Sequence, residues 1–164
     1  MDSRLKEMTA VLKKYKLTHG LTPEKFRLIL QELGPTYIKL GQIVSLHSDI
    51  LPKEYCEELM KLCSDVEPMP FEQVEAVIDA SFGYSWKDVF ASIDKKPLGA
   101  ASIAQVHRAT LKTGEQVVVK VQRKGIHEVM SKDMALLHKA VKLVPPISIK
   151  GIVDFDMVLD EMWA

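Results

Sequence analysis

Residues 97–122 read PLGAASIAQVHRATLKTGEQVVVKVQ, and this stretch decides the fold. Across residues 102–111 apolar and polar side chains alternate, which is the pattern of a half-buried β-strand. Thr113 and Gly114 supply the turn, because glycine adopts positive φ without steric cost. Three β-branched valines follow and lead to Lys120. The stretch therefore predicts an antiparallel hairpin whose second strand carries one long cation at its far end.

Helical patterns surround this hairpin on both sides. Apolar spacing, proline starts and glycine stops predict helices at residues 2–17, 22–33, 36–47, 51–63, 71–82, 126–143 and 152–163. A short strand is expected at residues 90–93. We therefore expect an α+β fold in two parts: a helical extension over residues 1–89, and a three-stranded antiparallel sheet with helices over residues 90–164.

The hairpin also carries the spacing of a phosphate-binding loop. Gly99, Ala101, Ala104 and Val106 fit the kinase pattern G-x-G-x-x-G-x-V, and the valine strand ends in Lys120 as V-A-I-K does. Backbone N–H groups of such a loop approach phosphates closely, and a compact ammonium suits the same anion. Alanine replaces two of the three glycines, which predicts a stiffer loop. The alternative is that Lys120 is a surface lysine at a strand end.

Three motifs in order identify a family that the chain resembles. The loop GAASIAQVHRA occupies residues 99–109, and the lysine strand VVVKVQRKG occupies residues 117–125. Upstream lies a Lys-x-Gly-Gln motif formed by Lys39, Gly41 and Gln42. Together they resemble the UbiB/AarF (ABC1-type) family of atypical, kinase-like proteins, over roughly residues 22–164 of this sequence.

This resemblance implies a partial kinase N-lobe that binds ATP or ADP with Mg²⁺. The residues implied in nucleotide binding are Gly99, Ala100, Ala101, Ser102, Val106, Val118 and Lys120. The loop would cradle the phosphates, and the lysine would bind them. Val118 stands where kinases have an alanine in the adenine pocket, so a smaller pocket and weaker binding are expected.

The Lys-x-Gly-Gln motif is implied to gate the nucleotide cleft. In proteins that the chain resembles, this helix lies across the cleft, with its lysine and glutamine near the nucleotide. By spacing alone, Lys39 and Gln42 are surface residues of a helix. Gly41 inside a helix costs about 1 kcal/mol relative to alanine, which favours a role in close packing.

The motifs that complete a kinase site are missing from the sequence. We find no H-R-D-like loop and no D-F-G triplet, and the family's anchoring glutamate is implied to follow Ala164. Asp154 and Asp156 are interpreted as exposed acids at a helix start rather than metal ligands. His107 is likewise interpreted as a structural or surface residue. The C-lobe and the Mg²⁺ ligands are therefore expected outside this chain, which alone would not transfer a phosphoryl group.

Composition limits the partners and the compartment. Lysine plus arginine and aspartate plus glutamate number 22 each, so net charge is zero and nucleic acid is not favoured as a partner. Cys56 and Cys63 do not have metal-ligand spacing, and reduced thiols are expected. No apolar run reaches the roughly 20 residues of a membrane span. The sequence predicts a cytoplasmic protein, with peripheral attachment to a membrane as the open alternative.

Two functions remain open from sequence. The first is the N-terminal fragment of a UbiB-like atypical kinase or ATPase, a family linked by resemblance to isoprenoid-quinone (ubiquinone) biosynthesis and so to isoprenoid lipids. The second is a non-catalytic interaction module, a helical domain with a degenerate N-lobe that binds a partner protein or a membrane surface. Under either function, exposed sheet and helix faces predict self-association.

One substitution tests the loop assignment. Ala101→Gly removes a methyl group and widens the backbone range, so nucleotide affinity and the preference between ADP and ATP should change. Titration of both nucleotides against the two proteins measures this. Unchanged affinity and unchanged preference would show that the loop does not contact phosphates.

Overall fold

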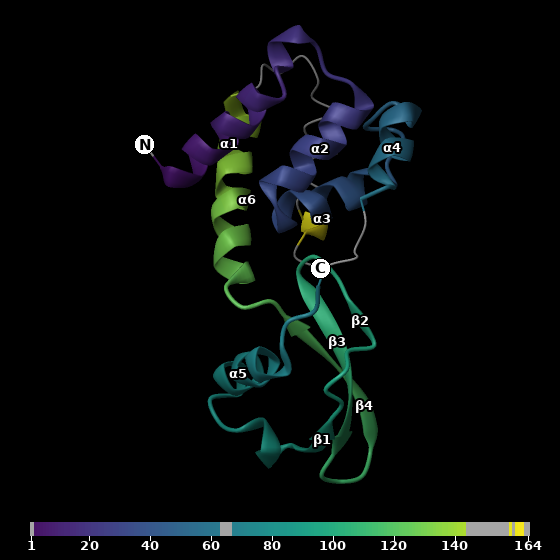
Figure 1. Cartoon of the computed structure of the whole chain (residues 1–164), viewed down its shortest axis with the longest axis vertical. Helices are drawn as coiled ribbons and strands as arrows, with labels where there is room; N and C mark the ends of the chain where they lie inside the picture. The colour runs from purple at the N-terminus through teal and green to yellow at the C-terminus, as the bar shows by residue number, and fades with distance from the viewer. Residues whose placement is uncertain (1, 63–66, 144–157, 159, 163–164) are drawn as a thin grey trace. The chain divides into compact units, whose positions relative to one another are not determined.

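The hairpin expected at residues 97–122 forms most of a small antiparallel sheet in the computed structural model of the chain (Figure 1). Gly114 has a φ of 92°, as the predicted turn requires. The structure describes residues 2–62, 67–143, 158 and 160–162. Most of the helix expected at residues 152–163 lies outside this part of the chain.

The chain divides into two compact units, which are described separately. The helical unit comprises residues 1–63 and 130–164, and the sheet unit comprises residues 64–129. The domain boundary expected between residues 89 and 90 stays a prediction.

The helical unit is built from short amphipathic helices. Their bounds are α1 Ser3–Lys14, η1 Leu17–His19, α2 Pro23–Leu33, α3 Pro35–Val44, α4 Lys53–Leu59 and the part of α6 (Ile126–Leu143) from Met130 onward. Thr22 caps α2, because its side-chain oxygen accepts from Lys25 N at 3.2 Å. Gly34, at a φ of 105°, separates α2 from α3, as the glycine–proline break predicts.

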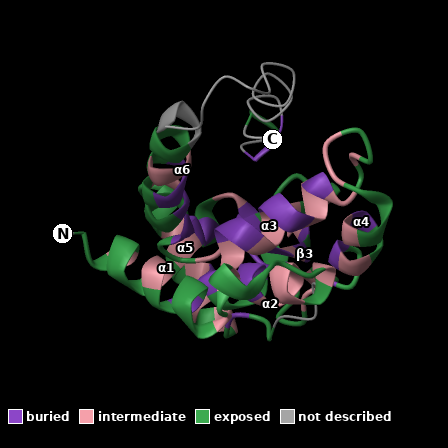
Figure 2. Ribbon diagram, turned by 90° about the horizontal axis from the view of Figure 1, so that it is seen from above, coloured by how far each residue is buried: buried purple, intermediate pink, exposed green. Residues whose placement is uncertain are grey.

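Burial within this unit is concentrated on α2 and α3. The buried residues of α3 are Thr36, Tyr37, Leu40, Gly41 and Val44. Figure 2 shows α3 coloured as buried over much of its length. Helix α1 buries little of its apolar surface. Val11 is buried, whereas Leu5 and Leu12 are 39% and 37% exposed.

An ion pair joins α1 to α6 inside the helical unit. Arg4 Nε donates to Asp133 Oδ1 at 2.7 Å, and Asp133 is fully buried. Arg4 Nη2 also donates to the carbonyl of Leu33 at the end of α2. The hydrogen bonds to Asp133 raise the pKa of the Arg4 guanidinium above its usual value. The pair therefore satisfies a buried charge and connects three helices.

The sheet unit has four strand segments but is three strands wide. The segments are β1 Phe90–Ile93, β2 Gly99–Ala100, β3 Ala104–Leu111 and β4 Gln116–Gln122. β4 pairs with β3 along its length, so β1 and β2 must share the other edge of β3. β1 pairs with the C-terminal half of β3 and β2 with its N-terminal half. The predicted three-stranded α+β fold is thus confirmed, with one edge strand interrupted.

Helix α5, Phe71–Phe82, ends at Gly83 as predicted and packs against one face of this sheet. The buried cluster there consists of Met69, Val74, Ile78, Trp86, Phe90, Ile93, Ala109 and Val121. Trp86 opens the short helix η2, Trp86–Asp88, and its indole donates to Glu75 Oε2 at 2.8 Å. The core of the sheet unit therefore lies between α5 and a single face of the sheet.

A buried polar network holds the segment before α5 against β3. His107 Nδ1 lies 2.7 Å from the carbonyl oxygen of Asp94, which only accepts, so this nitrogen carries the proton. His107 Nε2 then accepts from Gln105 Nε2 at 2.9 Å. Gln105 Oε1 accepts from Met69 N at 2.7 Å. His107, which is fully buried, therefore has a structural setting, as the sequence analysis expected.

Close packing explains the glycine inside α3. A Cβ atom at Gly41 would overlap Leu62 Cδ1 and lie 2.8 Å from Leu30 Cδ1. In a free helix, alanine is favoured over glycine by about 1 kcal/mol. Gly41→Ala should instead destabilise the protein, by about 1–3 kcal/mol, because the added methyl group overpacks the core.

Gly99→Ala is the matched control, because its Cβ would meet nothing within 4 Å. Chemical denaturation of both variants measures the effect, and the control should stay within about 0.5 kcal/mol of the parent protein. A Gly41→Ala variant as stable as the parent would contradict the packing role of Gly41.

Candidate nucleotide-binding site

The register of the hairpin brings the expected nucleotide residues to one face of the sheet. Val106 pairs with Lys120, and Arg108 pairs with Val118. Directly opposed residues of an antiparallel pair share a face, and so do alternate residues of one strand. Val106, Val118 and Lys120 therefore lie together on the face opposite α5, which we call the open face.

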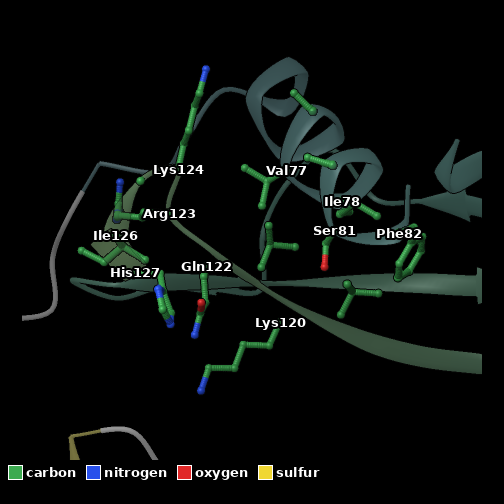
Figure 3. A pocket seen from close by; sticks show the side chains of 15 residues that line it. Val77, Ile78, Ser81, Phe82, Lys120, Gln122, Arg123, Lys124, Ile126 and His127 are labelled. Carbon is green, nitrogen blue, oxygen red and sulfur yellow. The ribbon is translucent and has the colours of Figure 1, made fainter. Parts of the chain in front are cut away.

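Lys120 projects from this open face. Val119 and Val121, its neighbours on β4, pack toward the core, whereas Lys120 is exposed. Figure 3 shows its side chain pointing to the side of β4 away from α5. Across the part of the chain that the structure describes, no hydrogen bond or ion pair occupies its amino group. The cation is thus available to an anionic ligand.

The expected phosphate loop is a tight connection between β2 and β3. Gly99 pairs with Val106, and Ala100 pairs with Gln105. Ala101 N donates to Ala104 O at 2.7 Å, which closes the tip of the loop. The N–H group of Ala101 is therefore used within the loop rather than presented to a ligand.

Ser102, at the loop tip, is buried, with 5% of its surface exposed. This burial places its side chain in the protein rather than in solvent. Ser102 therefore presents little surface to a phosphate in this structure.

One residue of the open face is missed by the sequence analysis. Leu98 N donates to Val106 O at 2.7 Å while Gly99 is the register partner of Val106. Two consecutive residues thus oppose one, as in a β-bulge, and Leu98 lies beside Val106. Leu98 and Val118 are 56% and 60% exposed. The leucine directly before the loop glycine is the sequence signal that could have indicated it.

The Lys-x-Gly-Gln motif has partners of its own within the helical unit. Lys39 Nζ donates to Met162 O at 2.6 Å, and Gln42 Nε2 donates to Leu62 O at 3.3 Å. Both side chains therefore bind backbone carbonyls from elsewhere in the unit, and Gly41 lets the helix approach Leu62. The implied role of the motif in gating a nucleotide cleft stays a prediction.

Tyr37, also on α3, lies next to the Arg4–Asp133 pair. The guanidinium carbon of Arg4 stands 5.9 Å from the centre of the tyrosine ring. Burial raises the pKa of Tyr37 to about 12, and the charge of Asp133 adds to the shift. The phenol therefore stays neutral at physiological pH.

A groove of about 690 Å³ lies on the other side of β4 from the expected nucleotide site. It is lined by residues 76–82 of α5, except Asp79, and by residues 119–127. Figure 3 shows Val77, Ile78 and Ser81 on its α5 side. Lys120 is among the lining residues, but its side chain points to the side of β4 away from α5 (Figure 3). This groove is therefore distinct from the open face that carries Val106 and Lys120.

Metal ligands are scarce in the described part of the chain. No group of three or more histidine, cysteine, aspartate or glutamate residues there could hold a metal ion. Residues 104–110 and 116–122, which form the paired hairpin, contain no carboxylate, so the paired strands offer no negatively charged ligand for Mg²⁺. Asp154 and Asp156 lie outside the described residues.

Two further expectations concern cysteine and the membrane. Cys56 is a buried free thiol, and Cys63 lies outside the described residues. Within the described ranges, no helix combines the length and the apolar character needed to span a bilayer.

The fold and the lysine strand define the class of protein as kinase-like. The family model described as "ABC1 atypical kinase-like domain" matches residues 61–164, which is more than half of the chain. The chain belongs to the ABC1 family of atypical kinase-like proteins, as the three sequence motifs indicate.

Similar curated proteins support this family assignment. The "Probable protein kinase UbiB" of Pseudomonas fluorescens (strain Pf-5) is 48% identical over 113 residues, which cover 69% of this chain and 21% of the relative. An "Uncharacterized protein in hydrogenase 1 5'region" of Clostridium pasteurianum is 38% identical over 169 residues, covering 98% of this chain and 32% of the relative. The chain thus spans a third or less of the length of these two relatives.

A solved structure is also similar. The structure titled "The complex structure of Rv3197-erythromycin from Mycobacterium tuberculosis" matches with a TM-score of 0.51 and 30% sequence identity. The match covers 96% of this chain and 40% of that one. The similarity therefore extends through nearly the whole of this sequence.

Proposed function

We propose that this chain is the N-terminal part of a UbiB-like atypical kinase or ATPase and that its sheet unit binds ATP or ADP. One observation carries the proposal: Lys120 is exposed, has no partner among the described residues, and lies beside the apolar residues Val106 and Val118 on the open face. This face adjoins the loop that starts at Gly99. A nucleotide needs this combination, an apolar surface for its base and a cation for its phosphates.

The base and the phosphates of the nucleotide would bind to different parts of the site. The adenine ring would lie against Leu98, Val106 and Val118, whose exposed surface is lost from water on contact. The α- and β-phosphates would bind Lys120 and the backbone of the loop that starts at Gly99, apart from the Ala101 N–H, which Ala104 O already accepts. Mg²⁺ would accompany the nucleotide and neutralise phosphate charge. Because the paired strands offer no carboxylate, any carboxylate ligand of the metal would come from elsewhere.

The wider role follows from the family and is proposed with it. The relative from Pseudomonas fluorescens is named UbiB. A link to isoprenoid-quinone (ubiquinone) biosynthesis fits a cytoplasmic protein that meets isoprenoid lipids at a membrane surface. The Lys-x-Gly-Gln helix would restrict access to the nucleotide. Its lysine and glutamine already bind backbone carbonyls at 2.6 and 3.3 Å, which supports an ordered helix.

A second candidate function rests on exposed apolar residues of the helical unit. Leu46 and Met60 are 79% and 69% exposed, just after α3 and α4. Side chains of this kind support an interaction module that binds a partner protein, a membrane surface or a second copy of the chain. This candidate predicts no nucleotide binding by the sheet unit.

Titration with Mg-ATP and Mg-ADP separates the two functions. A ligand at 100 times its Kd adds roughly 2.7 kcal/mol of stability, which is visible as a rise of several degrees in Tm. Lys120→Ala should abolish the rise, because it removes the phosphate-binding cation. The measurement is thermal unfolding of the purified chain with and without nucleotide.

Lys112→Ala is the matched control, since Lys112 is an exposed lysine near the hairpin turn, away from the loop. It should keep the full increase in Tm. An increase that persists in Lys120→Ala would exclude this lysine as a phosphate ligand. An absence of any increase in the parent protein would favour the interaction module.

A further inference from the structure

Arg123 connects three segments of the sheet unit just after β4. Its backbone N–H donates to Ile103 O at 2.8 Å. Its side-chain Nε donates to Ala101 O at 3.3 Å, and its Nη2 donates to Glu67 O at 3.0 Å. The arginine lies three residues beyond Lys120 and is half-buried. One residue therefore binds the tip of the phosphate loop and the segment that precedes α5.

The chemistry of arginine suits this bridge. The guanidinium group presents several N–H donors in a rigid plane, so it can bind two carbonyl oxygens at once. Hydrogen bonds from a charged donor are stronger than neutral ones. A lysine in the same place carries a single ammonium group on a flexible chain and cannot reproduce the planar fork.

The bridge adds to the backbone hydrogen bonds that already hold the loop. The hydrogen bond from Ala101 N to Ala104 O closes the loop tip, and the backbone of Arg123 holds Ile103. The Arg123 side chain then restrains Ala101 from outside the loop. Because Arg123 directly follows β4, which carries Lys120, the loop and the lysine are attached to the same part of the chain.

The hydrogen bond from Arg123 Nη2 to Glu67 O also attaches the segment Glu67–Pro70. Within that segment, Met69 is held by Gln105, whose Oε1 accepts from Met69 N at 2.7 Å and whose Nε2 donates to Met69 O at 3.4 Å. Gln105 is the register partner of Ala100 in the phosphate loop. The segment is thus attached to the loop region at two points, through Arg123 and through Gln105.

We propose that Arg123 is a positioning residue for the nucleotide site, which fixes the phosphate loop and couples its conformation to the segment Glu67–Pro70. The proposal rests on the nucleotide-binding function proposed above. Arg123 acts through the loop and does not itself touch the nucleotide. A loop held in advance loses less conformational freedom on binding, so removal of the bridge weakens nucleotide affinity.

The test compares Arg123→Gln with Lys124→Gln. The control removes the same charge from the adjacent exposed residue. Hydrogen exchange of the amides at residues 99–104, and of Glu67 and Met69 in the second segment, is measured without nucleotide and reports the two attachments. Pro68 and Pro70 have no amide hydrogen. Fluorescence titration with Mg-ATP reports affinity. Arg123→Gln should accelerate exchange in both segments and weaken affinity roughly 5- to 10-fold, the scale of one lost hydrogen bond, while Lys124→Gln changes neither.

Arg123→Lys completes the series if the glutamine variant unfolds. It keeps the charge but cannot span both carbonyls, so exchange should still accelerate and affinity should fall by an intermediate factor. Unchanged exchange at residues 99–104 in a folded variant would overturn the bridge. Accelerated exchange with unchanged affinity would overturn the coupling to nucleotide.

The experiment also distinguishes a failure of nucleotide binding itself from a failure of the positioning role. If the parent protein does not bind Mg-ATP, nucleotide binding is wrong and the coupling is overturned with it, whereas the exchange data still decide whether Arg123 holds the loop. Faster exchange spread over the whole sheet unit would show a general loss of stability and would overturn a specific positioning role.

Discussion

The register between β3 and β4 is the constraint on which the sheet unit depends. Seven consecutive pairs run from Ala104 opposite Gln122 to Thr110 opposite Gln116. Because side chains alternate between faces, this register directs Val119 and Val121 to the core and Lys120 to the open face. A slip of one residue would bury the lysine and expose the valines. The same pairing therefore builds the core and presents the candidate site.

The buried polar network strengthens this register. Gln105 and His107 stand on the core face of β3, where unpaired polar groups would be costly. Each finds partners: Gln105 binds the backbone of Met69, and His107 binds Asp94 O. These contacts are directional, so they specify where the flanking segments lie. Apolar packing against α5 supplies the bulk of the stabilisation, and the network selects one arrangement of the chain.

In the helical unit, close approach and a buried ion pair serve a similar purpose. Gly41 allows Leu30 and Leu62 to pack against the backbone of α3. The Arg4–Asp133 pair connects residues 129 positions apart in the sequence. Removing one partner of such a pair leaves a buried charge, which is much costlier than the modest net gain from forming it. The core of the helical unit is therefore held by specific contacts as well as by apolar packing.

Local patterns in the sequence determined the elements, and tertiary structure determined their partners. The hairpin, the turn at Gly114 and helix α5 follow from alternation, positive φ and helical spacing, which act over a few residues. The motif spacing likewise determined that Val106, Val118 and Lys120 belong together. Only the fold decided that Lys39 binds Met162 O, that Leu98 lies beside Val106, and that Arg123 reaches back to Ala101 and Glu67. These contacts join residues up to 123 positions apart, and no periodicity in the chain encodes which distant carbonyl a cation will meet.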